Sequence, residues 1–343
     1  MFRPLSAMAM LLLATAVALA SDAENDGFAI IKRIPGPDGN WDYAIADAVG
    51  RRLYVARDYG VMSVDLDTGA IVPQLVAGHG VHGIAAVGTT GLFVSTNGDS
   101  GNATIFAGNT GKVLGILKAG SQPDSVVFEP KSRLVVAFNH ESGDATLIDP
   151  RAIRVVGTIP IGGTLEFAAV DLEGHAYVNI ANKNRIAVVD IQKRRVTGVI
   201  PLTGCEEPSG LAYDTRDRIL IAACFNGVAE FVDPNTRSQI TAINTGKFPD
   251  AVIWDPERHL AFVPSFADGD LTVIAVRGRG DIKAIQRLPT QMGTRTGALD
   301  STTGKIYLPT SKLKPPAKEG EYPTPVPGTF EILVINTPKN ATH

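Results

Sequence analysis

The sequence predicts an all-β chain folded as a seven-bladed β-propeller of four-stranded antiparallel blades. Two stretches 126 positions apart, at 122–137 and 248–263, share a Pro-Asp pair, two apolar runs, an acid and a second proline. Looser copies bring the number of repeats to seven, at steps of 40 to 46 residues. Short apolar runs bounded by Gly, Asp, Asn and Pro are typical of strands and turns, so each repeat is expected to form one sheet. Both faces of such a sheet are apolar and need a neighbouring blade to cover them.

Each repeat opens with the strand that would line the central channel, followed by a turn and a second strand. The seven copies read WDYAIADAVGRRLYVA (41–56), VHGIAAVGTTGLFVS (81–95), PDSVVFEPKSRLVVA (123–137), LEFAAVDLEGHAYVNI (165–180), PSGLAYDTRDRILIAA (208–223), PDAVIWDPERHLAFV (249–263) and RTGALDSTTGKIYLP (295–309).

The third repeat illustrates the four expected strands, which we name A to D from the channel outward. PDSVVFE, RLVVAF, ATLID and VVGTIPI are apolar or alternating segments, and PKS, NHESGD and PRAIR separate them. The seventh repeat has only three such segments, at about 296–300, 305–309 and 330–336. The segment FAIIKRIP (28–35) ends like the fourth strands of other repeats. We therefore expect it to complete the last blade, which closes the ring and removes an open sheet edge.

These repeats resemble YVTN-type repeats, because LYVA, AYVN and LAFV stand where that family has its second-strand tetrapeptide. The chain as a whole is similar to the YncE-like secreted bacterial propellers. WDY, VHGIA, CEEPSGLAYD and IYLPT occur here in the order in which that family has such phrases. The resemblance implies a propeller of the WD40-like type outside the cytoplasm. It implies no catalytic residue, since the family has no agreed activity.

The first twenty residues predict a signal peptide. Arg3 precedes an apolar run that ends at Ala18-Leu19-Ala20, which suits cleavage before Ser21. A membrane anchor is the alternative, although the apolar run is short for a spanning helix. We expect a periplasmic or secreted protein with one propeller domain at 21–343, no later membrane-spanning segment, and a monomeric state.

The charge and the cysteine content of the chain bear on its partners, its disulfide bonding and its cofactors. Without residues 1–20 the chain keeps 31 basic and 35 acidic residues, so nucleic acid is not expected as a partner, because phosphate binding needs clustered Lys and Arg. Cys205 precedes the A strand of the fifth repeat and Cys224 ends its B strand, so a disulfide between them is expected. No C-x-x-C-H motif occurs, and no covalent haem is expected.

The candidate site is the ring of residues at the start of the seven A strands. The ring consists of Asp42, His82, Asp124, Glu166, Ser209, Asp250 and Thr296, with Arg57 and Arg295 as counter-charges. Converging carboxylates raise one another's proton affinity unless a cation neutralises them, so Asp42, Asp124, Glu166 and Asp250 are candidate ligands for Ca²⁺ or Mg²⁺. The alternative is that each acid caps its own turn.

Loops joining strands B and C should fringe the same mouth, among them 57–59, 97–99 and 139–141. The seventh repeat carries a longer loop at 311–328 that holds five prolines and is a lid, a binding loop or a plain linker. His140, His175 and His259 occupy different positions in their repeats and are interpreted as surface or structural residues.

The leading functional hypothesis is a non-catalytic propeller that binds a ligand or a protein partner at the channel mouth. The alternative is a divalent-metal-dependent hydrolase or lactonase in which the carboxylate ring holds the metal and His82 is the base. A quinone-dependent oxidoreductase is weaker still, because Trp41 and Trp254 are the only tryptophans. No zincin, α/β-hydrolase or P-loop motif occurs.

Overall fold

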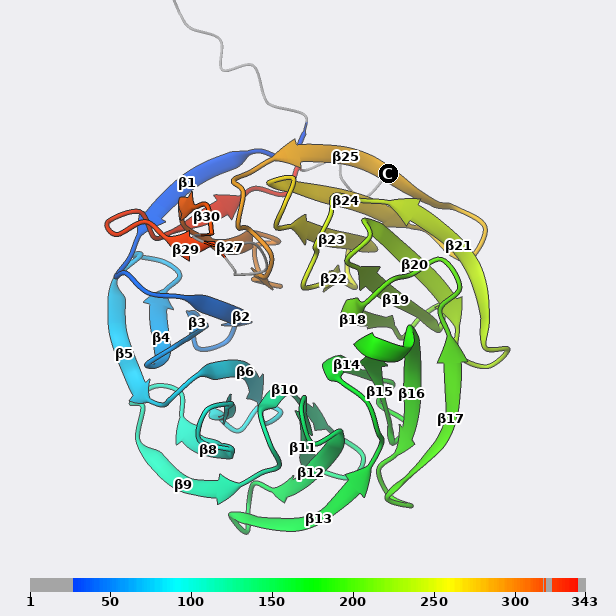
Figure 1. Cartoon of the computed structure of the whole chain (residues 1–343). Helices are drawn as coiled ribbons and strands as arrows, with labels where there is room; N and C mark the ends of the chain where they lie inside the picture. Colours follow the sequence, from blue (N-terminus) through cyan, green and yellow to red (C-terminus); the bar gives the residue numbers. More distant parts are fainter. Residues whose placement is uncertain (1–26, 317, 319–322, 339–343) are drawn as a thin grey trace, which may run out of the picture.

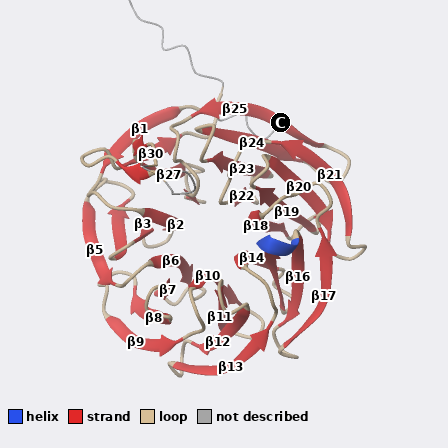
Figure 2. Ribbon diagram, viewed as in Figure 1, coloured by secondary structure: helices blue, strands red, loops and turns tan. Residues whose placement is uncertain are grey.

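The computed structural model describes residues 27–316, 318 and 323–338. Seven four-stranded antiparallel sheets stand around a central channel, as Figure 1 shows. Nearly all of the described regular structure is strand, and the one helical turn is η1 (Ala181–Lys183), blue in Figure 2. The predicted seven-bladed propeller is confirmed. The predicted signal peptide at 1–20 lies outside the described residues.

The first six blades follow one another along the chain, each with its A strand at the channel. Blade one is β2 (Trp41–Asp47), β3 (Arg52–Arg57), β4 (Gly60–Asp65) and β5 (Ile71–Ala77); blade two is β6 (Val81–Ala86), β7 (Leu92–Asn97), β8 (Asn102–Ala107) and β9 (Val113–Lys118); blade three is β10 (Pro123–Glu129), β11 (Leu134–Asn139), β12 (Asp144–Asp149) and β13 (Arg154–Pro160). Blade four is β14 (Leu165–Val170), β15 (His175–Ile180), β16 (Arg185–Asp190) and β17 (Arg195–Pro201); blade five is β18 (Pro208–Asp214), β19 (Ile219–Cys224), β20 (Val228–Asp233) and β21 (Ser238–Asn244); blade six is β22 (Ile253–Asp255), β23 (Leu260–Ser265), β24 (Asp270–Val276) and β25 (Ile282–Pro289).

Blade seven closes the ring with the first strand of the chain, as predicted. Its order is β26 (Ala298–Leu299), β27 (Ile306–Thr310), β30 (Glu331–Ile335) and β1 (Ile30–Pro35), and β1 pairs antiparallel with β30. Just before β1, the backbone of Phe28 exchanges two hydrogen bonds with the Gln286 side chain of β25. The N-terminal strand is therefore fixed to both of the last two blades.

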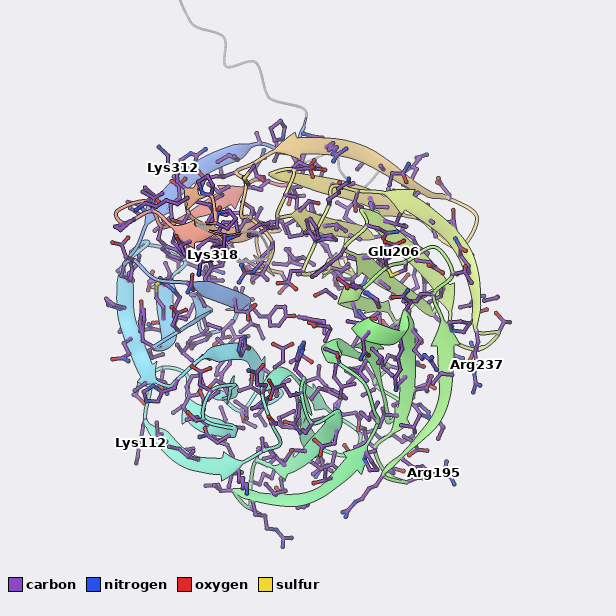
Figure 3. The ribbon with its side chains drawn as sticks, in the orientation of Figure 1. Lys112, Arg195, Glu206, Arg237, Lys312 and Lys318 are labelled. Atoms are coloured by element: carbon purple, nitrogen blue, oxygen red, sulfur yellow. A yellow bond between two sulfur atoms is a disulfide. The ribbon has the colours of Figure 1, made fainter. Side chains whose placement is uncertain are left out.

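The core lies between the blades. The described residues form seven buried apolar clusters, and each joins two adjacent blades. The middle strands β23 and β24 are buried throughout, whereas the outer strand β25 alternates between exposed and partly buried residues. Figure 3 shows side chains filling the spaces between the sheets and Lys112, Arg195 and Arg237 pointing outward at the circumference. This arrangement is what two-faced apolar sheets require.

Cys205 and Cys224 form a disulfide, which confirms the predicted pairing. The bond ties the segment before β18 to the end of β19, and both sulfurs are buried in the cluster between blades four and five. Within the described residues no helix is long and apolar enough to cross a membrane.

The predicted long loop at 311–328 contains a small hairpin of β28 (Leu313–Lys314) and β29 (Thr324–Pro325). Its base is fastened by a hydrogen bond between the hydroxyls of Ser311 and Thr329 (2.7 Å) and by donation from Gly328 N–H to Asp38 Oδ1 (2.7 Å). Pro323, just before β29, reaches the channel mouth.

Candidate functional site

A repeated β-bulge positions the residues of the predicted ring. In blade one the ladder between β2 and β3 pairs Trp41 with Arg57 and then Ala44 with Val55, so strand A contains one extra residue. The A strands of blades two to five have the same irregularity at the same place. In blade six an isolated bridge from Pro249 to Ser265 precedes the shorter strand β22. Bulges redirect side chains and are common at the rims of closed sheets, and five of the seven ring residues line the mouth.

Polar side chains of neighbouring blades satisfy the backbone carbonyls of these bulges. Thr96 Oγ1 donates to the carbonyl of Asp124, and Thr296 Oγ1 donates to the carbonyl of Asp42 (2.7 Å). Asn179 Nδ2 donates to the carbonyl of Ser209 (2.8 Å). Buried backbone groups need such partners, and these bonds fix the bulges rigidly relative to one another.

The bulges surround a pocket of about 910 Å³ at the channel mouth. Its lining contains seven acids, two histidines and a single arginine. The charged and titratable residues are Asp42, Asp58, Asp99, Asp124, Glu166, Glu207, Asp250, His82, His140 and Arg295. Seven acidic side chains face three basic ones, so the pocket is suited to cations.

The structure places five of the predicted ring residues in this pocket: Asp42, His82, Asp124, Glu166 and Asp250. The other two ring residues use their hydroxyls in structural bonds. Ser209 Oγ donates to Asp250 Oδ1 (2.5 Å), and Thr296 is fully buried.

The two predicted counter-charges differ in position. Arg295 lines the pocket, and its Nε lies 3.2 Å from Asp250 Oδ2. Arg57 does not line it, because its guanidinium is fully buried over the Phe330 ring (4.0 Å) and donates to the carbonyls of Pro37, Gly39 and Asn40. The assignment of Arg57 as a ligand-binding residue is therefore corrected: it holds the chain before β2.

The ring acids are not turn caps. Within the described part of the chain, no backbone N–H donates to a carboxylate of the predicted metal ligands Asp42, Asp124, Glu166 and Asp250. Acids at the other end of the A strands do cap turns. Asp171 Oδ1, for example, accepts from the N–H groups of Glu173 (2.8 Å) and His175 (3.0 Å). The ring carboxylates are therefore free to bind something other than their own backbone.

Two histidines pair with these acids. His82 Nδ1 lies 2.5 Å from Asp42 Oδ2 and 3.6 Å from Asp124 Oδ1. His140 Nδ1 lies 3.2 Å from Glu166 Oε1 and 3.0 Å from the carbonyl oxygen of Leu165. His140, interpreted from sequence as a surface or structural residue, thus also lines the pocket. The signal that identifies it is its spacing, 16 residues after Asp124, which places it in the B–C loop of blade three.

Burial and mutual repulsion alter the proton affinities here. Burial opposes protonation of His82, but the hydrogen bond to Asp42 and the charges of Asp42, Asp124 and Asp99 raise its pKa to about 9. The hydrogen bond to Glu166 raises the pKa of His140 despite burial.

The pKa of Asp124 is well above its usual value, because the carboxyl is buried and lies near Glu166 and Asp42. Its Oδ2 is a buried acceptor that lacks a hydrogen-bond partner among the described residues, and the residue is 8% exposed. Such an orphaned acceptor in a pocket is the kind of group that a ligand satisfies.

An aromatic pair crosses the channel. Tyr43 and Phe167 occupy the second bulge position of blades one and four, and their rings meet edge to face at 4.8 Å. In the other blades this position is small, and a Cβ on Gly83 would lie 2.5 Å from the carbonyl oxygen of Asp124. Burial, followed by the charges of the four ring acids, raises the pKa of Tyr43 well above its usual value. The phenol therefore stays neutral among them.

Phenylalanines form the wall of the mouth at blades five and six. Phe225, Phe248 and Phe266 line the pocket, and the rings of Phe225 and Phe248 meet edge to face at 5.4 Å. Phe248 is 47% exposed and has φ of 53° although it precedes Pro249. A positive φ is uncommon for residues other than glycine, so the fold holds this aromatic side chain at the mouth against a backbone preference. An adjoining groove of about 620 Å³ shares Glu207, Phe225 and Phe248 with the pocket.

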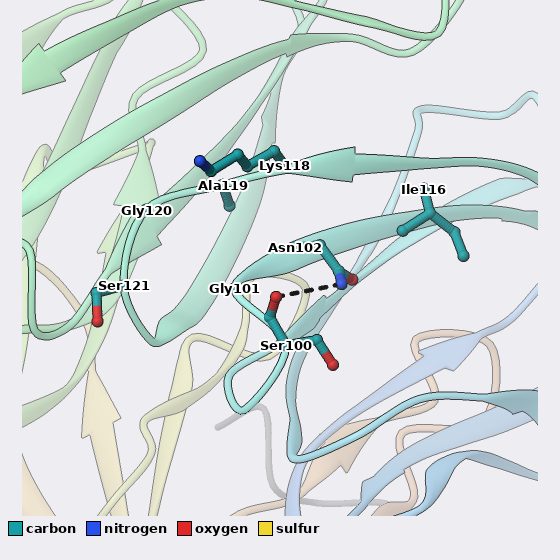
Figure 4. A pocket seen from close by; sticks show the side chains of 8 residues that line it. All are labelled: Ser100, Gly101, Asn102, Ile116, Lys118, Ala119, Gly120 and Ser121. Atoms are coloured by element: carbon teal, nitrogen blue, oxygen red, sulfur yellow. Dashed lines mark hydrogen bonds between the residues drawn. The ribbon is translucent and has the colours of Figure 1, made fainter.

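A separate groove of about 610 Å³ is lined by residues of β8 and β9, the loop before β8 and the segment that leads to β10 (Figure 4). Asn102 Nδ2 donates to the carbonyl of Ser100 there (3.4 Å), and Lys118 is the one charged side chain in the lining. It has no cluster of titratable groups and is not a candidate site.

No protein-family model and no curated protein matches this chain. Many solved structures have a similar fold, among them the following two. One is a chain of hydrazine synthase from Kuenenia stuttgartiensis, with a TM-score of 0.65 and 14% identity, covering 80% of this chain and 92% of that chain. The other is a chain of the mitotic checkpoint complex, with a TM-score of 0.73 and 12% identity, covering 97% of this chain and 98% of that chain. At these identities the likeness shows the propeller fold alone.

Proposed function

We propose that this protein is an extracytoplasmic, monomeric binding propeller whose channel-mouth pocket takes a positively charged ligand, either a small molecule or a basic group of a protein partner. The observation that carries the proposal is the lining: seven acids and a wall of phenylalanines face one arginine and two histidines. Carboxylates attract the charge, and aromatic faces stabilise a cation further when water is excluded.

Membership of the YVTN-repeat, YncE-like family is part of the proposal. Its support is the order of the WDY, VHGIA, CEEPSGLAYD and IYLPT phrases along the chain. The disulfide supports a location outside the cytoplasm, where such bonds persist. The hairpin of the 311–328 loop is proposed to contact the ligand through Pro323, which lines the pocket.

The test uses benzyltrimethylammonium, a permanent cation with an aromatic ring, against the neutral benzyl alcohol. We expect only the cation to bind in calorimetry. Phe248→Ala should weaken binding about 2- to 30-fold, the range of one lost cation–π contact. Ile116→Ala, which truncates an exposed side chain in the groove of Figure 4, is the matched control and should change nothing. Equal binding of both probes would contradict the proposal.

A divalent-metal-dependent hydrolase or lactonase is the second candidate. The observation that favours it is that two groups of metal-ligating side chains share Asp124: Asp42, His82 and Asp124, and Asp124, His140 and Glu166. The test is hydrolysis of a panel of lactones and aryl esters with added Zn²⁺ or Ca²⁺. A metal-stimulated rate lost in Asp124→Asn would support catalysis, and a rate no greater than that of the metal ion alone would contradict it.

A further inference from the structure

The sequence predicts a ring of four carboxylates that binds Ca²⁺ or Mg²⁺. The structure brings a different set of donor atoms together. Asp42, His82 and Asp124 offer one imidazole nitrogen and two carboxylate oxygens that all lie within 4.8 Å of one another. Asp250, which belongs to the predicted set, is instead paired with Arg295 and Ser209. An imidazole among the donors favours transition metals over Ca²⁺ and Mg²⁺.

We infer that Asp42, His82 and Asp124 bind a divalent transition-metal ion at the channel mouth. This inference deepens the proposed cation pocket and rests on it. A cluster of acids alone would not justify it, but Asp124 Oδ2 supplies an independent reason. It is a buried acceptor, in a residue 92% withdrawn from solvent, with no hydrogen-bond partner in the described structure. Three protein ligands leave further coordination positions open toward the pocket.

The distances suit a small ion. Ligands bound at about 2.0 to 2.2 Å to a tetrahedral ion stand roughly 3.3 Å apart. His82 Nδ1 and Asp124 Oδ1 are 3.6 Å apart, close to that value. His82 Nδ1 and Asp42 Oδ2, at 2.5 Å, would separate by less than about 1 Å to admit the ion.

The backbone at Gly98 leaves room for the His82 imidazole. A Cβ on Gly98 would lie 2.7 Å from His82 Nε2, so a larger residue would displace the ring. Gly98 is the blade-two counterpart of His140, since each stands 16 residues after its ring residue. Blade two therefore presents the histidine from the bulge, and blade three presents it from the loop.

The second group, Asp124, His140 and Glu166, is the weaker candidate. His140 Nδ1 faces the carbonyl oxygen of Leu165 at 3.0 Å, and a nitrogen that donates to a carbonyl has no lone pair for a metal. His82 Nδ1 pairs only with carboxylates among the described residues, and a metal ion held by those carboxylates would replace the proton that His82 shares with Asp42. If the ion is bound by the first group, replacing His82 should weaken binding and replacing His140 should not. Binding by the second group predicts the reverse.

The experiment titrates Zn²⁺ into the untagged 21–343 chain, stripped of metal with a chelator, by calorimetry. We expect about one ion per chain with a Kd below about 10 μM, and Ca²⁺ binding at least about tenfold weaker. Asp124→Asn and His82→Gln should each weaken Zn²⁺ binding at least about tenfold. His140→Gln should retain the ion.

His175→Gln is the matched control, because His175 Nδ1 also faces a carboxylate, Asp171 Oδ2 at 2.8 Å, outside the pocket. It should leave the affinity for Zn²⁺ unchanged. If Asp124→Asn does not fold, His82→Gln carries the test, since that side chain is 36% exposed.

Three results would overturn the metal site: no binding at 100 μM Zn²⁺, undiminished binding in His82→Gln, or loss of the ion in His140→Gln. Benzyltrimethylammonium cannot coordinate a metal, so it tests the pocket separately. If that probe binds and Zn²⁺ does not, the metal site is wrong and the cation pocket stands. If neither binds, both are wrong.

Discussion

Replacing Asp250 by Asn should stabilise the metal-free protein in neutral solution. Burial, then the charge of Asp42, raises the pKa of Asp250 to about 6, although Arg295 and the Ser209 hydroxyl favour the ionised form. The folded state therefore holds this proton more tightly than the unfolded chain does, whose carboxyl has the ordinary value of 3.8. Unfolding releases the proton between about pH 4 and pH 6, so the native protein loses stability as the pH rises through that interval.

The size of the effect follows from the same pKa. A difference of about 2 units between folded and unfolded states corresponds to about 3 kcal/mol at pH 8, as an upper value. Asparagine removes the charge and keeps an oxygen that can accept from Ser209 Oγ. We expect the free energies of unfolding of the two proteins to agree near pH 4 and to diverge in favour of Asp250→Asn by up to about 3 kcal/mol at pH 8.

The assay is urea unfolding in EDTA across pH 4 to 8, followed by the fluorescence of Trp41 and Trp254. Glu257→Gln is the control, since this exposed acid makes no side-chain hydrogen bond or ion pair within the described residues. It should leave the free energy of unfolding unchanged. A destabilised Asp250→Asn protein at pH 8, or a difference that does not vary with pH, would refute the reasoning.

Three further predictions concern the ring and its maturation. The double change Cys205→Ser, Cys224→Ser should lower the stability by up to about 3 kcal/mol, measured as the fall in urea midpoint, because it frees a loop of 19 residues; an unchanged midpoint would contradict this. Deleting 22–35 should open blade seven and give oligomers in size-exclusion chromatography, whereas a monomer of unchanged Tm would show another mode of closure. Mass spectrometry of the exported protein should find Ser21 first, and an intact Met1 would exclude cleavage.

The fold could be predicted from sequence because a propeller repeats one local pattern. Each blade needs two apolar faces and turns at fixed spacing, and a sequence shows both directly. Ring closure could also be predicted, because the last repeat lacks a fourth strand and residues 28–35 have the pattern of such a strand. The disulfide followed from its two cysteines flanking the same pair of strands.

The site could be predicted only in part, because alignment of repeats gives positions around the channel and not directions of side chains. Arg57 and Arg295 both looked like counter-charges. Only Arg295 faces the pocket, whereas Arg57 ends strand B, and its guanidinium turns into the interface with Phe330. The sequence also does not predict contacts across the channel, because Tyr43 and Phe167 are far apart in sequence and come from blades one and four.

Comparing equivalent positions of the repeats explains why the two sides of the channel mouth differ in chemistry. Sixteen residues after each ring residue, blades one to six present Asp58, Gly98, His140, Asn182, Phe225 and Phe266. In blades two, three, five and six the backbone N–H at this position donates to the carbonyl two residues before the ring residue. Because the scaffold does not depend on the side chain at this position, the residue there can vary with the ligand. Polar residues and glycine fill it in blades one to four, beside the bulge acids, and phenylalanine fills it in blades five and six. A cationic ligand at the mouth would therefore meet carboxylates on the first side and aromatic rings on the second.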